Sequence, residues 1–188
     1  VKATEVINKT IREIAGSFDV EPDTTHGIYM QDDKAPSSLP ASINRNPDMR
    51  AFNWRDINMM SSVKSQGSCG SCWAFAAAAV YEGVYKIMYG KEIDLSEQYI
   101  VDCLECATPF QKFDCGSCGG GITTQTSKAM MTQGVPLESE VPYLAQNGVC
   151  RNPVSGATYK VKQFGYITSA VEKPTVRQIK EALCKYGP

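Results

Sequence analysis

Eight cysteines constrain what this 188-residue chain can fold into, and all of them lie between Cys69 and Cys184. Such a density is typical either of a disulfide-bonded protein from an oxidising compartment or of a metal site in a reducing one. Most of the cysteines sit close together in pairs with two residues between them: Cys69 and Cys72, Cys103 and Cys106, and Cys115 and Cys118. The spacing alone leaves both kinds of framework open.

The overall composition excludes several classes of partner. Forty-three per cent of the residues are hydrophobic, which is enough for a sizeable globular core. Nineteen Lys and Arg residues against twenty Asp and Glu residues give a formal net charge of −1, so no strong positive field attracts nucleic acid or an anionic membrane. No apolar run approaches the roughly 18 residues that a membrane span requires. We therefore expect no nucleic acid and no membrane among the partners.

Hydrophobic spacing divides the chain into helical segments and one long segment of different character. Residues 16–50 are dominated by Gly, Asp, Pro, Ser and Asn, and so long a loop is uncommon inside a compact domain. We interpret it as a linker or as a strap lying on another surface. The patterns predict helices over residues 3–15, Cys72 to about Tyr89, Ser96 to near Cys103, Thr123–Gln133 and Thr175–Lys185, and a strand over Lys160–Ile167.

The most informative stretch runs from Gln66 to Trp73, where a turn rich in Gly and Ser leads into the helix that Cys72 begins. A thiolate is the competent sulfur nucleophile, and the N-terminus of a helix stabilises one. Gln66 lies six residues upstream and can fold back to aim its amide N–H₂ near that sulfur. A donor there would stabilise an oxyanion formed on an attacked carbonyl. The pattern thus predicts a cysteine nucleophile with a side-chain oxyanion donor.

The same stretch matches the C-G-[SA]-C-[WY] signature of papain and the cathepsins. Further motifs then follow in that family's order: Leu95-Ser96-Glu97-Gln98 with Val101-Asp102-Cys103, then Cys118-Gly119-Gly120-Gly121, then Val141-Pro142-Tyr143 followed by Cys150. The chain therefore resembles a papain-family cysteine peptidase from about Trp54 to Cys150, and more loosely to Pro188.

The resemblance implies an α+β fold of the papain-like, two-domain type. We expect a prosegment over residues 1–50, made of a short helix and an extended strap, with the part near Phe18 to Met30 lying over Cys72 and blocking it. Residues 51–165 then form the helical left domain with the nucleophile helix. Residues 166–188 begin the β-barrel-like right domain, which is mostly absent from this chain.

The resemblance also implies a cysteine endopeptidase, in zymogen form, that acts through a thiolate and an acyl-enzyme. Cys72 is then the nucleophile, and Gln66 with the Cys72 backbone N–H forms the oxyanion site. The backbone of Gly120 and Gly121 pairs with an extended peptide substrate, which is strand addition. The residues after them, Ile122 and Thr123, line part of the pocket for the substrate's second residue before the cut.

The expected partners and covalent links follow from the same resemblance. It implies disulfides Cys69–Cys118 and Cys103–Cys150, leaves Cys106–Cys115 as an extra bridge, and makes Cys184 the odd cysteine. The family's histidine and asparagine have no counterpart after Cys72, and the only histidine, His26, is not assigned that role. We expect a C-terminal remainder of the enzyme to carry both. The other expected partners are protein or peptide substrates and the prosegment, which acts as an inhibitor. We expect no cofactor and no metal. A single Asn8-Lys9-Thr10 sequon leans toward secretion, and we expect a secreted or lysosomal or vacuolar protein.

Three alternatives stay open at this point. Cys69-x-x-Cys72 is also the spacing of a thioredoxin-like redox pair. Cys103-x-x-Cys106 with Cys115-x-x-Cys118 is a double CxxC that would suit zinc, although the gap of eight residues is shorter than the usual 15–20 or so. A catalytically inactive relative of the peptidases would bind peptides or a partner without cutting them.

Overall fold

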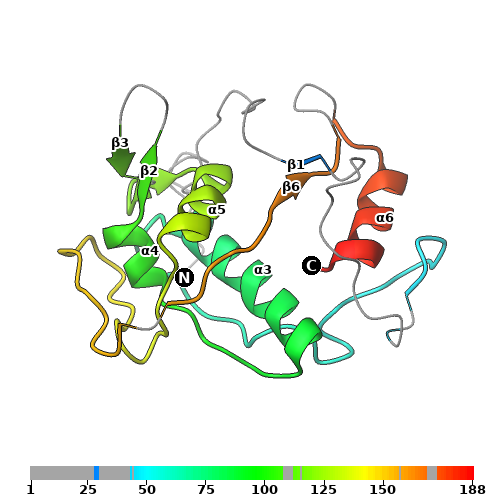
Figure 1. Ribbon diagram of the computed structural model, residues 1–188. Helices are drawn as coiled ribbons and strands as arrows, with labels where there is room; N and C mark the ends of the chain where they lie inside the picture. Colours follow the sequence, from blue (N-terminus) through cyan, green and yellow to red (C-terminus); the bar gives the residue numbers. More distant parts are fainter. Residues whose placement is uncertain are drawn as a thin grey trace, which may run out of the picture. The chain divides into compact units, whose positions relative to one another are not determined.

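The computed structural model describes residues 28–29, 43, 45–107, 112–114, 116–156, 158–168 and 173–188. The chain divides into two compact units. Figure 1 labels the helices and strands along the chain. Unit 1 comprises Val1–Val20, Ser62–Ala79 and Asp94–Val161, and unit 2 comprises Glu21–Ser61, Val80–Ile93 and Lys162–Pro188. The predicted helix over residues 3–15 lies outside the described residues. The three-part division into prosegment, left domain and right domain stays a prediction.

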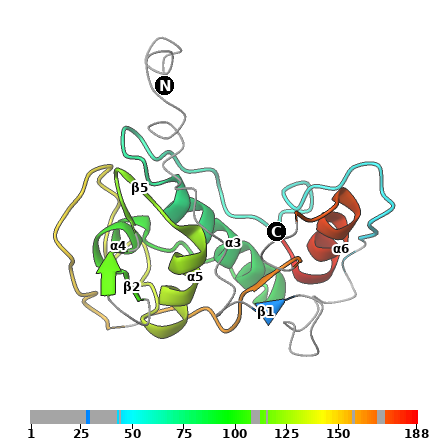
Figure 2. The ribbon, with the colours of Figure 1, turned by 90° about the horizontal axis from the view of Figure 1, so that it is seen from above.

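Three helices organise the described part of unit 1, and the sequence predicts each of them. Helix α3 (Cys72–Tyr89) begins here and carries the alanine run, whose helix propensity is high. Helix α4 (Glu97–Cys103) is capped by Ser96, whose hydroxyl accepts from the Tyr99 N–H. Helix α5 (Thr123–Thr132) lies beside α4 (Figures 1 and 2) and is followed by Gly134, whose positive φ of 76° suits the end of a helix.

The strands of unit 1 are short antiparallel pairs. Strand β2 (Glu105–Ala107) pairs with β3 (Lys112–Asp114), and β4 (Gly116–Ser117) pairs with β5 (Gly120–Gly121). Single bridges join Leu95 to Leu137 and Val135 to Tyr159. The fully buried side chains that hold these elements together include Trp73, Leu95, Ile100, Met130 and Val135.

The described part of unit 2 contains the rest of α3, one short parallel pair of strands and the C-terminal helix. Strand β1 (Ile28–Tyr29) pairs with β6 (Gly165–Tyr166), and α6 (Val176–Tyr186) follows. Trp54 and Ile87 form its buried core. Helix α3 ends at Tyr89, and Gly90 with a φ of 65° follows it as predicted. Among the described residues, no helix is long and apolar enough to cross a membrane.

The strand predicted over Lys160–Ile167 is mostly wrong. Only Gly165–Tyr166 is a strand, and Tyr159, just before the predicted segment, makes an isolated bridge to Val135. The Val161 N–H donates instead to the carbonyl of Met130 in α5, at 3.2 Å. The prediction fails because a pattern of period two indicates which side chains share a face of an extended segment but does not reveal which backbone groups will pair.

Candidate active site

The site is built on a tight turn that ends where α3 begins. Gly67 adopts a φ of 61° in this turn, and the Cys69 N–H points back to the Gln66 carbonyl at 3.4 Å. The N–H groups of Ala74 and Phe75 both donate to the Ser71 carbonyl, which starts the helix directly around Cys72. Cys72 is a half-buried thiol at the first residue of α3. Its sulfur therefore lies at the end of the helix where the first backbone N–H groups have no partner within the helix.

A second turn is fastened to the turn over residues 66–71, which we call the nucleophile turn after the role expected for Cys72. Cys69 and Cys118 form a disulfide with their Cα atoms 4.6 Å apart. The Gly70 N–H donates to the Cys118 carbonyl at 2.9 Å, and the Trp73 indole N–H donates to the Ser117 carbonyl at 3.2 Å. These three links hold strands β4 and β5 beside the start of α3. Thus Gly121 lies against Trp73, the residue after Cys72, without belonging to the same element.

The residues expected to contact substrate occupy this second turn and the helix after it. Gly120 and Gly121 form β5, and one edge of β5 is taken by β4. Among the described strands, none pairs with the other edge. Ile122 is the N-cap residue of α5, and Thr123, the first residue of that helix, is exposed. The structure therefore brings all four into one continuous segment beside the nucleophile turn.

The Gln66 side chain folds back, as the sequence suggests, and it bonds to the backbone of the turn. Its amide Nε2 donates to the Cys69 carbonyl at 2.7 Å. The amide nitrogen carries two hydrogens. This bond uses one of them, and the other can still be donated. The bond also fixes the side chain on the same turn as Cys72.

Side chains of α4 and of its capping residue Ser96 hold the loop over residues 137–150 in place. The Ser96 hydroxyl donates to the Val141 carbonyl at 2.5 Å. The Gln98 carbonyl oxygen accepts from the Leu144 N–H, and Asp102 accepts from the Gly148 N–H, both at 2.8 Å. The disulfide Cys103–Cys150, with its Cα atoms 4.7 Å apart, closes the loop. The Ser-Glu-Gln motif is thus a support for this loop.

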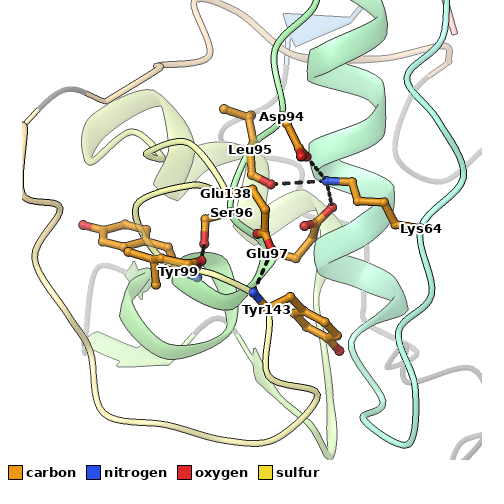
Figure 3. Close-up of polar contacts among 9 residues, drawn as sticks. Lys64, Asp94, Leu95, Ser96, Glu97, Tyr99, Glu138 and Tyr143 are labelled. Carbon is orange, nitrogen blue, oxygen red and sulfur yellow. Dashed lines mark hydrogen bonds and ion pairs between the residues drawn. The ribbon is translucent and has the colours of Figure 1, made fainter.

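Glu97, the remaining residue of that motif, is a buried charge with a cation beside it. Its carboxylate is 1% exposed and lies 2.6 Å from the ammonium of Lys64. The same ammonium contacts the Asp94 carboxylate at 2.5 Å and the Leu95 carbonyl (Figure 3). A buried carboxylate needs such a partner, because an unpaired charge in the protein interior is costly. The pair therefore anchors the segment before the nucleophile turn to α4.

The contacts of Tyr143 could not be predicted from the sequence, in which it is only part of a family motif. Its hydroxyl contacts the nucleophile turn at Ser71 and Gln66. Burial raises the pKa of the Tyr143 phenol; the hydrogen bond with Ser71 opposes the rise, and the charges of Glu97 and Glu138 add to it. No local pattern signals this contact, since Ser71 and Tyr143 are 72 residues apart in the sequence.

The cysteine pairing removes two of the open alternatives. Cys69 is bonded to Cys118, so it does not form a redox pair with Cys72. Cys103 and Cys118 are both in disulfides, so the double CxxC cannot supply four thiolates to zinc. The two disulfides are those that the family resemblance implies. Cys115 and His26 lie outside the described residues, so the expected Cys106–Cys115 bridge stays a prediction, whereas Cys184 is a half-buried thiol on α6.

Comparison with known proteins supplies the family. The model of the papain family of cysteine proteases matches residues 49–188. The chain belongs to the papain family. A viral cathepsin of Choristoneura fumiferana nuclear polyhedrosis virus is 38% identical over 139 residues, which are 73% of this chain and 39% of that protein.

Solved structures agree on the papain-like α+β fold. A structure from work on the mite allergens Blo t 1 and Der p 1 is 28% identical with a TM-score of 0.62, over 89% of this chain and 49% of that one. The ragweed pollen allergen Amb a 11, a cysteine protease in its proform, is 29% identical with a TM-score of 0.52, over 76% of this chain and 38% of that one. This papain-family chain spans less than half the length of each of these three proteins.

Proposed function

We propose that the protein containing this chain is a cysteine endopeptidase made as a zymogen, with Cys72 as its nucleophile. The observation that carries the proposal is the position of Cys72, a thiol at the first residue of a helix, on a turn that a disulfide fastens to the Gly120–Gly121 segment. Membership of the papain family supports the same reaction class. The substrates are proteins or peptides.

In the proposed reaction the Cys72 thiolate adds to the carbonyl carbon of the scissile bond. The second amide hydrogen of Gln66 and the Cys72 backbone N–H stabilise the resulting oxyanion. The C–N bond then breaks, the leaving amine takes a proton from an imidazolium, and a thioester forms. Water attacks the thioester, gives its proton to the imidazole and restores the thiolate.

The imidazole, and the asparagine that orients it, are proposed to lie outside this sequence. The family uses a histidine after the nucleophile, and this sequence contains His26 as its single histidine. The relatives are longer than the region they share with this chain, so they have room for both residues. The C-terminal remainder of the same enzyme is therefore the proposed partner.

The remaining parts of the proposal concern substrate, prosegment and location. The edge of β5 away from β4 is where an extended peptide would add as a strand, with Ile122 and Thr123 beside it. Residues 1–50 would form an inhibitory prosegment, which the proform of the ragweed allergen supports by similarity. The two disulfides favour an oxidising compartment, so we propose secretion or a lysosomal or vacuolar location.

The decisive experiment is a pair of cysteine substitutions in the full-length protein. Cys72→Ser is expected to lower the hydrolysis of a fluorogenic peptide by at least about 10³-fold, because a hydroxyl at this site is a far weaker nucleophile. Cys184→Ser is the matched control and is expected to keep full activity, since its thiol lies on α6 outside the nucleophile turn. Mass spectrometry after treatment with iodoacetamide locates the reactive sulfur.

One result would replace the proposal by its alternative. A full-length protein that binds peptides, keeps its alkylatable Cys72 and cleaves nothing would be a catalytically inactive papain-like binding protein. Peptide affinity measured by fluorescence anisotropy, alongside the hydrolysis assay, separates the two readings.

A further inference from the structure

The Tyr143 hydroxyl connects two points of the turn that leads to Cys72. It lies 2.9 Å from the Gln66 carbonyl oxygen and 2.5 Å from the Ser71 hydroxyl. A phenol has one hydrogen, and the carbonyl can only accept, so Tyr143 donates to Gln66. Ser71 must then donate to the Tyr143 oxygen. The three groups form a directed chain of hydrogen bonds from Ser71 through Tyr143 to Gln66.

The rest of Tyr143 is held firmly enough to act as a fixed point. Its ring meets the Phe75 ring of α3 edge-on, with centroids 4.9 Å apart and an interplanar angle of 90°. Its backbone N–H donates to the Glu138 carboxylate at 2.7 Å (Figure 3). The neighbouring loop residues Val141 and Leu144 are hydrogen-bonded to the side chains of Ser96 and Gln98. The position of the hydroxyl is therefore set by contacts that do not involve the turn.

The two contacted points are the ones that matter for the proposed chemistry. Gln66 carries the side chain assigned as oxyanion donor, and Ser71 immediately precedes the nucleophile and is fully buried. The turn between them contains Gly67, with its φ of 61°, and Gly70. Glycines give a turn wide conformational freedom, so its shape must be fixed by contacts from outside.

We propose that Tyr143 is a positioning residue for catalysis, whose hydroxyl fixes the distance between the oxyanion donor Gln66 and the nucleophile Cys72. This inference rests on the proposed peptidase function. A displacement of reacting groups by about an ångström can cost on the order of 10²-fold in rate, so a clamp on both ends of the turn acts on the rate of the chemical step. Tyr143 itself touches neither substrate nor sulfur in this role.

The test is Tyr143→Phe in the full-length enzyme, which removes one oxygen and keeps the ring on Phe75. The kcat for a fluorogenic peptide is expected to fall about tenfold with KM changed less than about twofold, which corresponds to about 1.4 kcal/mol in the transition state. The affinity for a peptide aldehyde, which forms a tetrahedral adduct on the cysteine, should weaken by the same factor. Rates are expressed per active site titrated with a thiol reagent, so a misfolded fraction does not enter.

Tyr99→Phe is the matched control, because Tyr99 is another half-buried tyrosine of unit 1, and its ring points away from Tyr143 (Figure 3). It is expected to leave kcat, KM and the aldehyde affinity unchanged. A merely structural loss of one tyrosine hydroxyl would affect both variants in the same way. Equal kinetics of wild type and Tyr143→Phe would overturn the inference.

Ser71→Ala tests the same chain of hydrogen bonds from its other end, and it serves if Tyr143→Phe does not fold. It should lower kcat about threefold, since Tyr143 still holds the Gln66 carbonyl. In the Tyr143→Phe background it should add less than about twofold, because the shared bond is already gone. Full additivity of the two losses would count against the clamp. A wild-type enzyme that cleaves no peptide refutes the proposed function and this inference together, whereas an active wild type with unaffected variants refutes only the inference.

Discussion

The contact between Gly121 and Trp73 shows how closely the candidate substrate segment lies against the nucleophile helix. A Cβ atom placed on Gly121 would overlap the six-membered and five-membered parts of the Trp73 indole. Trp73 is 1% exposed, and its indole N–H is committed to the Ser117 carbonyl at 3.2 Å. The ring therefore has little room to move aside, and only glycine fits at position 121.

Gly121→Ala is accordingly expected to lower the free energy of unfolding of the full-length protein by about 1–3 kcal/mol, because the extra methyl group overpacks a buried ring. Urea denaturation followed by tryptophan fluorescence measures the change. Gly119→Ala is the matched control in the same turn, since its added Cβ would meet only the Ser117 hydroxyl, at 3.3 Å. Equal destabilisation by both substitutions would show that the indole contact is not the cause.

At the scale of single residues, the sequence could predict what a short motif encodes. Cys72 at a helix start, and Gln66 folded back onto its turn, both follow from residues that are near in sequence. The Tyr143 contacts with Ser71 and Gln66 could not be predicted, because they join residues 72 and 77 positions apart. The same holds for Lys64, which lies in an irregular segment and whose partner Glu97 is the first residue of α4. Such contacts depend on the tertiary fold, which no periodicity reports.

Helices were predictable because their ends carry chemical signals. Ser96 caps α4, Gly90 and Gly134 follow α3 and α5, and Thr175 precedes α6. The strands carry no such signals. Strands β4 and β5 are two residues long and mostly glycine, a residue that disfavours strands. They exist because the Cys69–Cys118 disulfide and its neighbouring hydrogen bonds hold the turn in place.

Helix α6 offers a clean test of an end signal. Thr175 and Gln178 form a reciprocal capping box, in which each side chain accepts from the other's backbone N–H. Thr175→Ala should destabilise the first turn by about 1 kcal/mol, because a backbone donor loses its partner. Hydrogen exchange of the Gln178 amide is the local measurement and should become several-fold faster. Thr175→Ser keeps the hydroxyl and should exchange at the wild-type rate.

At the scale of the whole molecule, two disulfides among the described residues tie together residues 69–150, a stretch that is otherwise held by short helices and strands. Cys69–Cys118 spans 49 residues and Cys103–Cys150 spans 47, and the two loops overlap between Cys103 and Cys118. Cross-links that close loops of this size remove much of the conformational freedom of the unfolded chain, by about 4 kcal/mol each in the chain-entropy model. Domains are typically stable by only about 5–15 kcal/mol, so each bond is a large fraction of the total.

The two disulfides should nevertheless differ in what their removal does. Replacing Cys103 and Cys150 together by serine is expected to lower the free energy of unfolding by about 4 kcal/mol. The kcat per titrated active site should stay unchanged, because this bond closes the end of the loop at Cys150, whereas Tyr143 is held by its contacts with Phe75 and Glu138. Replacing Cys69 and Cys118 should cost a similar amount of stability and also lower kcat. That bond joins the Cys72 turn to the β4–β5 segment, so its loss leaves the two parts of the candidate site free to shift.

Chemical denaturation and active-site-titrated kinetics on the same samples separate these effects. Cys184→Ser provides the baseline, since it removes a half-buried thiol without opening a loop, and it should change the stability by less than about 1 kcal/mol. If both double substitutions lowered kcat equally, the disulfides would act only through general stability. If only the substitution of Cys69 and Cys118 lowered kcat, the link between the two turns would itself contribute to catalysis. Both double substitutions remove a similar loop constraint, so a difference in rate between them would have to come from the position of the bond.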